Sequence, residues 1–337
     1  MHGLIMIIPP IMAVPGRGPG IGPAIHVFYR GPVKRRGWPA FAGHDHGSPA
    51  MLGRRFTARL LAAALCIAGA LLGLPGRAQA QAPGLGAQAE LVDPNVFRVC
   101  ADPNNMPFSD QKGDGFENKL AELMASKLGE PVSYTYYPQV IGFVRNTLNA
   151  FRCDVVMGVA QGYDLVQTTN PYYHTAYALV FKPHDGLDGV DSLGDERLKD
   201  KRIGVVAGTP PASIMALDGL MAKAKPYPLT VDTRYESPTK DMIDDLIAGH
   251  IDAAVLWGPI AGYYAKHADP PLTVVLLLKE QGSMPMDYRI SMGVRHSDQD
   301  WKRKLNRLIA ENQDAINKLL MQFGVPLLDA QGHPLQQ

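Results

Sequence analysis

Polar side chains gather directly after the strand-like run that ends at Ala101. Asp102, Asn104 and Asn105 follow this run, and the aromatic residue Phe108 comes shortly afterwards. Carboxylate and amide groups beside an aromatic ring can bind a ligand through hydrogen bonds and packing. Ligands of open α/β sheets bind in loops at the carboxyl ends of strands. Asp-Pro and Asn-Asn pairs also form turns, so turn formation explains the same residues equally well.

Further candidate positions lie after other apolar runs. Thr209 precedes Pro210 and has the residue type of a helix N-cap, which favours a bound anion, although capping alone also explains it. Trp257 ends an apolar run, where an indole offers an apolar or aromatic contact to a ligand. The predicted ligand-binding set is completed by Phe116, Gln161, Tyr163, Tyr173, Glu236 and Gly258. Core packing is an equally good explanation for the tyrosines.

Residue patterns for catalysis and metal binding are weak. Ser213, His250 and Asp252 follow neither the chain order of a catalytic triad nor a nucleophile elbow. The run 204–208 has too few glycines for a dinucleotide fingerprint. The cysteines lack companion ligands at metal-binding spacing. We therefore predict no catalytic residue, no cofactor and no metal, and we expect a protein that is not an enzyme.

Basic residues are concentrated at the start of the chain. Residues 1–80 contain nine Lys and Arg against one acid, whereas the remaining 257 residues contain 24 basic and 31 acidic side chains. A leader of charge +8 in front of a body of charge −7 indicates a targeting segment. The acidic body has no basic stripe interleaved with aromatic residues, so we expect no nucleic-acid partner.

Residues 51–80 have the layout of a secretory signal peptide. A basic stretch precedes the apolar run 60–74, and Ala78-Gln79-Ala80 has the form of a cleavage site. The apolar run is shorter than the ~20 residues of a membrane-spanning helix. We predict cleavage after Ala80 and export to the periplasm. Residues 1–50 are expected to be a disordered, non-native extension in front of the true start at Met51.

Cys100 and Cys153 are the cysteines that remain after this cleavage. Two cysteines in an oxidising compartment commonly pair, and closing a loop of ~50 residues stabilises a fold by roughly 4 kcal/mol. Cys100 lies near the end of one predicted strand, and Cys153 lies at the start of another. If these strands are parallel neighbours, the two Cα atoms can exceed the ~7 Å limit of a disulfide. The sequence leaves the pairing open.

Apolar and amphipathic segments alternate along the rest of the chain. Their periodicity predicts helices at Phe116–Leu128, Ile141–Phe151, Pro210–Lys223, Pro238–Ala248 and Asp298–Phe323. It predicts strands at Val96–Ala101, Val132–Tyr137, Asp154–Val159, Arg202–Val206, Leu229–Thr233 and Ala253–Trp257. Alternation of this kind is typical of parallel sheets with helices on both faces.

Two β-like runs separate the two blocks of this pattern. Tyr177–Phe181 precedes the second block, and Tyr288–Val294 follows it. We expect the chain to build part of a first lobe (91–182), then a second lobe (187–282), and to return to the first (286–330). About 130 residues suit one lobe. The predicted fold is α/β, with mainly parallel sheets in two lobes, two connecting strands and a ligand groove between the lobes.

Several segments resemble family 3 extracellular solute-binding proteins, over about residues 91–328. They are Arg98–Ser109, Gly142–Leu148, Arg152–Val159, Pro171–Tyr173, Trp257–Tyr263, Met292–Arg295 and Gly324–Leu328. The set is more similar to the quinoprotein dehydrogenase-associated branch, the MxaJ/XoxJ-like proteins. This resemblance implies the type II periplasmic binding protein fold, in which two strands form the hinge between the lobes.

The chain departs from the amino-acid-binding members of this family at two charged positions. Those members have an arginine after the strand equivalent to Asp154–Val159, where this chain has Tyr163 and Asp164, and an aspartate at the place of Trp257. The arginine binds the ligand carboxylate and the aspartate binds its ammonium group. An unpaired buried carboxylate is costly, so the departures argue against zwitterion binding. Trp257 favours an apolar ligand or a protein segment instead.

The resemblance also implies a partner. It indicates a periplasmic protein that accompanies a PQQ-dependent alcohol (methanol) dehydrogenase and its cytochrome c, and that assists the maturation or activation of the enzyme. The groove would then hold a segment of the partner or a small molecule. Two alternatives stay open. One is the substrate-binding protein of an ABC transporter for a non-zwitterionic solute, and the other is a dehydratase-type enzyme, for which Glu236 is the candidate carboxylate.

Overall fold

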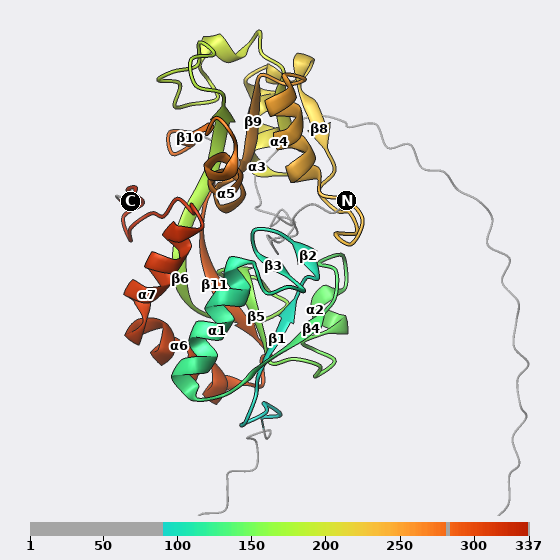
Figure 1. Ribbon diagram of the computed structural model, residues 1–337, viewed down its shortest axis with the longest axis vertical. Coiled ribbons are helices and arrows are strands. Elements are labelled where there is room, and N and C mark those ends of the chain that lie inside the picture. Colours follow the sequence, from blue (N-terminus) through green and yellow to red (C-terminus); the bar gives the residue numbers. More distant parts are fainter. Residues whose placement is uncertain (1–89, 281–283, 336–337) are drawn as a thin grey trace, which may run out of the picture. The chain divides into compact units, whose positions relative to one another are not determined.

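A computed structural model describes residues 90–280 and 284–335 of the chain (Figure 1). The expected extension (1–50) and the expected signal peptide (51–80) lie outside these residues, and both stay predictions. In the described residues, strands and helices alternate along the chain, as the sequence pattern indicates.

One large sheet organises the fold, in the strand order β4-β1-β5-β11-β6-β9-β7-β8, and β10 also pairs with β6. Two groups of strands in this order pair in parallel, β4-β1-β5 and β9-β7-β8. Their bounds are β1 (Phe97–Ala101), β4 (Val132–Tyr136), β5 (Val155–Ala160), β7 (Ile203–Val206), β8 (Lys225–Tyr227) and β9 (Ala253–Trp257). The predicted α/β class with mainly parallel strands is confirmed.

Two antiparallel strands lie between these groups. The first part of β6 (Gln167–Phe181) pairs with β11 (Asp287–Val294). The last part of β6 pairs with β9 and with β10 (Thr273–Leu276). The single long strand β6 therefore connects both groups of parallel strands.

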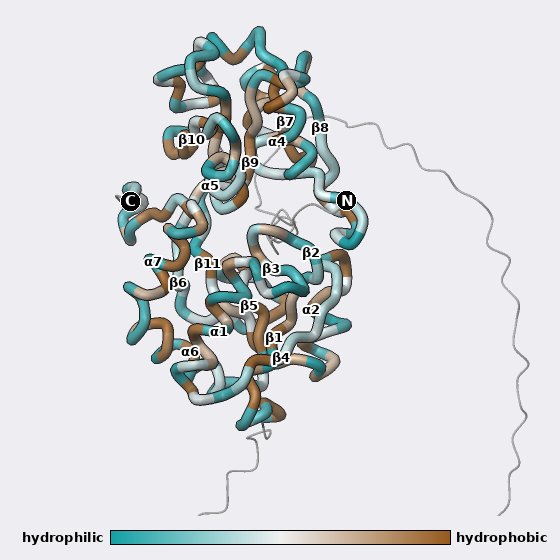
Figure 2. Tube along the Cα trace, viewed as in Figure 1, coloured by the Kyte–Doolittle hydropathy of each residue, from teal (hydrophilic) through white to brown (hydrophobic). Residues whose placement is uncertain are grey.

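Helices cover the sheet, and each helix buries the apolar side chains on one of its own faces. They are α1 (Phe116–Leu128), α2 (Phe143–Asn146), α3 (Pro210–Leu217), α4 (Pro238–Ala248), α5 (Gly258–His267), α6 (Gln299–Glu311) and α7 (Gln313–Gln322). Short 3₁₀ turns occur at Glu196–Leu198 and Leu220–Lys223. Helices α1, α6 and α7 lie beside strands β5, β6 and β11 in Figure 1. Hydrophobic residues run along β1 and β9 in Figure 2, where the core forms.

The predicted strand Leu229–Thr233 is wrong. The strand that pairs with β7 is β8, and Val206 stands opposite Tyr227. Pro228 follows directly and has no N–H group to continue the pairing. The chain after it forms a loop in which Thr233 contacts Asp102, so tertiary contacts override the β propensity of this run.

Other differences concern the lengths of elements and elements that were not expected. The predicted helix Ile141–Phe151 is reduced to α2, because Thr147 bonds back to the Phe143 carbonyl and Phe151 adopts a positive φ of 57°. The helix predicted at Pro210–Lys223 ends at Leu217, before a left-handed glycine. Helix α5, strand β10 and the hairpin of β2 (Asn104–Asn105) and β3 (Ser109–Asp110) were not predicted from the sequence.

The structure joins Cys100 to Cys153 by a disulfide bond, with the two Cα atoms 5.4 Å apart. Strands β1 and β5 are indeed parallel neighbours, but Cys153 lies just before β5 begins. The separation is therefore below the ~7 Å limit. The bond ties the end of β1, and hence the loop that follows it, to the start of β5.

Candidate functional site

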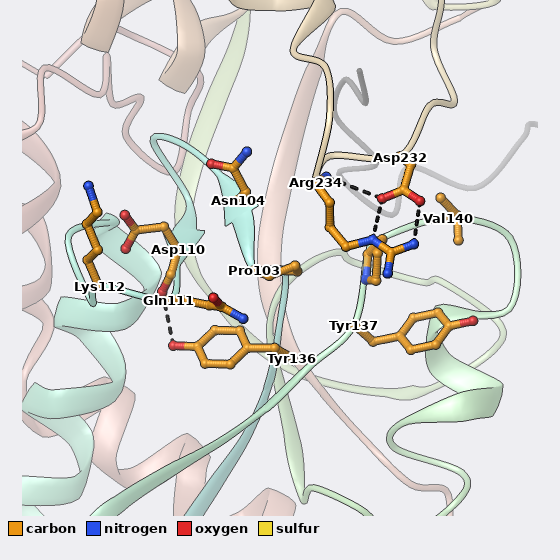
Figure 3. A pocket seen from close by; sticks show the side chains of 11 residues that line it. Pro103, Asn104, Asp110, Gln111, Lys112, Tyr136, Tyr137, Val140, Asp232 and Arg234 are labelled. Atoms are coloured by element: carbon orange, nitrogen blue, oxygen red, sulfur yellow. Dashed lines mark hydrogen bonds and ion pairs between the residues drawn. The ribbon is translucent and has the colours of Figure 1, made fainter.

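A pocket of about 820 Å³ opens beside the loop that follows β1 (Figure 3). Its polar and charged lining residues are Asn104, Asp110, Gln111, Lys112, Asp232 and Arg234. Its remaining lining residues are Pro103, Tyr136, Tyr137, Pro138 and Val140. These residues come from the β2–β3 hairpin, the end of β4 and the loop between β8 and α4, so segments far apart in the sequence build one pocket.

Asp102 fixes the loop on one side of this pocket. Its carboxylate accepts hydrogen bonds from the backbone N–H groups of Asn104 (2.9 Å) and Gln139 (2.7 Å) and from the hydroxyl of Thr233 (2.7 Å). The residue is 1% exposed. Burial raises the pKa of Asp102, and the three hydrogen bonds oppose this shift because they stabilise the charged form. Asp102 is therefore a structural anchor behind the pocket.

The two asparagines of the loop have separate roles. Asn104 is exposed, lines the pocket and donates from Nδ2 to the Thr233 carbonyl oxygen at 2.7 Å. Asn105 is buried and donates to Gln139 Oε1 at 3.2 Å. The predicted polar cluster Asp102, Asn104 and Asn105 is thus brought together, but Asn104 is the member that faces the pocket.

The charges of the pocket are largely balanced. Arg234 is held by Asp232 through two hydrogen bonds, Nε to Oδ1 at 2.6 Å and Nη2 to Oδ2 at 2.5 Å. Asp110 and Lys112 add one charge of each sign. In the described part of the chain, Lys112 makes no ion pair. The tyrosine hydroxyl of Tyr136 donates to the backbone oxygen of Asp110 at 3.0 Å, which orients the ring along the pocket (Figure 3).

A second polar centre lies around Glu117, in the first turn of α1. The residue is 7% exposed, and its carboxyl group packs against Gly158 of β5. Burial raises the pKa of Glu117 to about 8, and the charge of Asp102 adds to this shift. Glu117 was not among the predicted site residues, because an acid in the first turn of a helix is ordinary. The one sequence feature that could have indicated burial of Glu117 is its position directly after the apolar residue Phe116.

The prediction that Trp257 faces a ligand groove is wrong. The side chain is 1% exposed and packs against the rings of Tyr177 and Tyr288, with ring centroids 5.0 and 5.8 Å away. The pairing of β6 with β9 places Trp257 opposite Tyr177 and so directs the indole into this aromatic cluster. Its Nε1 has no hydrogen-bond partner among the described residues.

Four other predicted ligand contacts belong to the packed interior. Phe108 and Phe116 pack against each other, with ring centroids 5.1 Å apart, and Tyr173 packs edge-on against Phe116. Gly258 is packed so closely that a Cβ atom would overlap the carbonyl oxygen of Ala176. These residues position the site through the core and do not line the pocket.

The remaining predicted residues lie outside the pocket lining. Thr209 is 7% exposed and donates from its hydroxyl to the Val206 carbonyl (2.7 Å) instead of capping α3. Gln161 is exposed, whereas Tyr163 and Glu236 are half-buried. A role in ligand binding stays a prediction for these last three residues.

No helix in the described ranges has the length and apolar character needed to cross a bilayer.

The strand order and the pocket together define a class: the chain has the fold of the type II periplasmic binding proteins. No protein-family model matches the chain. Solved structures and curated sequences, however, identify its relatives.

The chain is similar to the periplasmic binding protein XoxJ from Methylobacterium extorquens AM1, at 40% sequence identity and a TM-score of 0.60. The match covers 69% of this chain and 99% of that chain. MxaJ from Methlophaga aminisulfidivorans MPT is 26% identical with a TM-score of 0.59, over 69% of this chain and 100% of that chain. Protein MoxJ from Paracoccus denitrificans is 27% identical over 261 residues, which are 72% of this chain and 92% of the relative. The chain belongs to the XoxJ and MxaJ family of periplasmic binding proteins.

Proposed function

We propose that this chain is a periplasmic accessory protein that assists the maturation or activation of a PQQ-dependent methanol dehydrogenase. Membership in the XoxJ and MxaJ family supports the periplasmic location and the class of binding protein. The observation that carries the proposal is the charge-balanced pocket with tyrosines in its lining, which we assign to a polypeptide segment of the dehydrogenase.

The chemistry of the pocket suits a polypeptide better than a small anion or a free amino acid. Two acids and two bases line it, and Arg234 is already bound at two atoms by Asp232. Lys112 is left as a point charge for a single contact, and the bidentate grip that an arginine gives to a free carboxylate is already occupied by Asp232. Tyrosine rings next to amide groups are typical of surfaces that recognise peptide segments.

Two large exposed side chains, which we call the rim residues, directly follow pocket-lining residues in the sequence. Ile141, next to the lining residue Val140, is 87% exposed, and Tyr235, next to Arg234, is 77% exposed. The guanidinium of Arg234 lies 5.4 Å from the centre of the Tyr235 ring. Exposed apolar and aromatic side chains around a polar pocket favour a protein partner.

Binding of the purified dehydrogenase to rim variants tests this proposal. We expect Ile141→Ser and Tyr235→Ala each to weaken the complex by about tenfold, or about 1.4 kcal/mol. Leu217→Ala, at a position of α3 that is 80% exposed and does not line the pocket, serves as the matched control. Rim variants that bind as tightly as this control would contradict the proposal.

The size of the pocket favours a second candidate function, the receptor of an ABC transporter for a non-zwitterionic solute. Its volume lies within the ~300–1,000 Å³ range of small-molecule sites. A thermal-shift screen separates the two functions, because a solute at 100 times its Kd stabilises the fold by about 2.7 kcal/mol. A solute that does so while the dehydrogenase does not bind would favour the receptor.

We also propose export through the signal peptide at 51–80, with cleavage after Ala80. Sequencing the amino terminus of the protein recovered from the periplasm tests this. Any peptide from residues 1–50 in that material would overturn the assignment.

A further inference from the structure

Strand β4 lies at one end of the large sheet (Figure 1). Within residues 90–280 and 284–335, β1 is the one strand that pairs with it, and β4 also packs against α1. The open side of such an edge strand presents backbone donors and acceptors to which a further extended chain can bond. β4 is therefore a candidate interaction surface.

The register of β4 on β1 decides which backbone groups face the open side. The N–H of Phe97 donates to the Pro131 carbonyl at 2.9 Å, and the N–H of Tyr137 donates to the Ala101 carbonyl at 3.0 Å. In a parallel pair, alternate residues of a strand bond to the neighbour, and the residues between them face away. The residues of β4 that turn their N–H and C=O groups outward are Val132, Tyr134 and Tyr136.

These outward groups are available to another chain. No hydrogen bond to them occurs among the residues that the structure describes. Val132, Tyr134 and Tyr136 are half-buried, and Ser133 between the first two is exposed. Each outward residue offers one N–H donor and one C=O acceptor, which is the arrangement that an added strand uses.

The opposite end of the strand order is protected against pairing, whereas β4 is not. β8 consists of Lys225, Pro226 and Tyr227, and lysine and proline are typical of edges that avoid another strand. β10, which pairs with β6, packs against α5. β4 has the sequence Val-Ser-Tyr-Thr-Tyr, which has a high β propensity and contains neither a charge nor a proline. Its edge is thus suited to a partner.

The tyrosine rings of β4 are already ordered. Tyr134 and Tyr136 stack, with ring centroids 5.3 Å apart and an angle of 19° between the ring planes. The Tyr134 hydroxyl donates to the Asn118 carbonyl at 3.3 Å, and the Tyr136 hydroxyl is bound to the backbone oxygen of Asp110. Side chains that are fixed in advance lose little conformational entropy when a partner binds.

The open edge leads directly into the pocket. Tyr136 has its outward backbone groups on the edge, and its side chain lines the pocket. Tyr137, Pro138 and Val140 continue the lining, and the rim residue Ile141 follows. An extended segment that occupies the pocket can therefore continue along β4.

We propose that β4 accepts an extended segment of the methanol dehydrogenase as an added β-strand, one end of which enters the pocket. This inference rests on the proposed function and names the chemistry of the bound segment. Alternate side chains of the segment lie beside Tyr134 and Tyr136, where β-branched and aromatic side chains pack well. Because β4 has no charged side chain to pair with, the paired stretch of the segment is uncharged.

Hydrogen exchange resolved to single amides tests the added strand, with the full chain measured alone and in complex with the purified dehydrogenase. The amides of Val132, Tyr134 and Tyr136 should exchange about tenfold more slowly in the complex. The amides of Ser133 and Thr135 bond to β1 and should be protected in both states. This alternation distinguishes strand addition from general burial of the surface.

Substitutions on the edge provide a second test. Ser133→Lys places a charge at an exposed position of the edge and should weaken the complex by about tenfold. Ser126→Lys adds the same charge at an exposed position of α1 and should bind like the wild type. Val132→Pro removes one outward N–H group and no bond to β1, so it should also weaken binding and keep the folded circular-dichroism spectrum.

The outcomes separate this inference from the proposed function. If the complex forms and the outward amides exchange as fast as in the chain alone, or if Ser133→Lys binds as tightly as Ser126→Lys, strand addition is wrong and the proposed function stands. A dehydrogenase that does not bind the wild type would overturn both. Protection of the outward amides in the chain alone, with a dimer that Ser133→Lys dissociates in analytical ultracentrifugation, would assign the edge to a second copy of this chain instead.

Discussion

The hydroxyl of Thr233 donates a hydrogen bond to Oδ1 of Asp102 at 2.7 Å, across 131 residues of sequence. The backbone oxygen of the same threonine accepts from Nδ2 of Asn104 at 2.7 Å. Two polar atoms of one residue therefore hold the loop after β1. The same contacts fix the neighbouring residues Asp232 and Arg234 in the lining of the pocket. The shape of the pocket thus depends on this threonine.

Replacing Thr233 by valine tests that dependence. We expect Thr233→Val to lower the free energy of unfolding by about 2 kcal/mol, because the buried Asp102 carboxylate loses one of its donors. Urea denaturation at pH 7 measures the change. Thr230→Val, at an exposed position three residues earlier, is the control and should change stability by less than about 0.5 kcal/mol. Equal unfolding midpoints for the two variants would show that the hydroxyl contributes nothing.

Local signals were sufficient where the end of an element is decided locally. The predicted bounds of α1 and α4 agree with the structure, because both helices end at glycines with left-handed backbone, Gly129 and Gly249. The predicted strand at Leu229–Thr233 failed because the partner of a strand is chosen by tertiary contacts. Pro228 stops the pairing one residue before that run begins.

The candidate site was predictable only in part, for a similar reason. The position of Asp102 and Asn104 after a strand was enough to place them at the carboxyl edge of the sheet. Whether an aromatic side chain faces a pocket or the core depends on the register of strand pairing, and this register buries Trp257. The burial of Glu117 depends on Gly158, which lies 41 residues further along the chain. No local pattern encodes that contact.

The disulfide Cys100–Cys153 should be a main stabiliser of this part of the fold. The two cysteines are 53 residues apart in sequence, and closing a loop of this length stabilises the folded state by about 4 kcal/mol in the chain-entropy model. We expect the double variant Cys100→Ala, Cys153→Ala to lose about this much. Urea denaturation of the variant and of the reduced wild type measures it. A wild type whose unfolding midpoint does not respond to reductant would contradict the role of the bond.

The contact between Gly158 and Glu117 predicts a non-additive pair of substitutions. Gly158→Ala should destabilise the fold by about 1–3 kcal/mol, because the new methyl group overlaps the Glu117 carboxyl. In the double variant Gly158→Ala, Glu117→Ala the overlapping carboxyl is absent, so the cost of the alanine at 158 should largely disappear. Gly194→Ala is a suitable control, because a Cβ there meets only Ser192 Oγ, at 3.6 Å. Additive free energies in the double-mutant cycle would show that the two residues do not touch.

The buried acid should also make the stability of the protein depend on pH in a defined window. The pKa of Glu117 is about 8 in the folded chain and 4.5 as its ordinary value, so the folded state binds the extra proton between these values. The stabilisation is therefore complete below about pH 4.5 and is lost as the pH rises through about 8. The loss is at most about 1.4 kcal/mol per pH unit, the free-energy equivalent of one pKa unit.

Denaturation curves measured from pH 5 to 9 test this dependence. The free energy of unfolding should fall more steeply with pH for the wild type than for Glu117→Gln, whose amide carries no charge at any of these pH values. Glu122→Gln should follow the wild type, because Glu122 is exposed and pairs with Lys119 at the surface. Parallel curves for the wild type and Glu117→Gln would mean that the carboxyl is ionised in the folded protein throughout, and hence that water or a bound cation already reaches it.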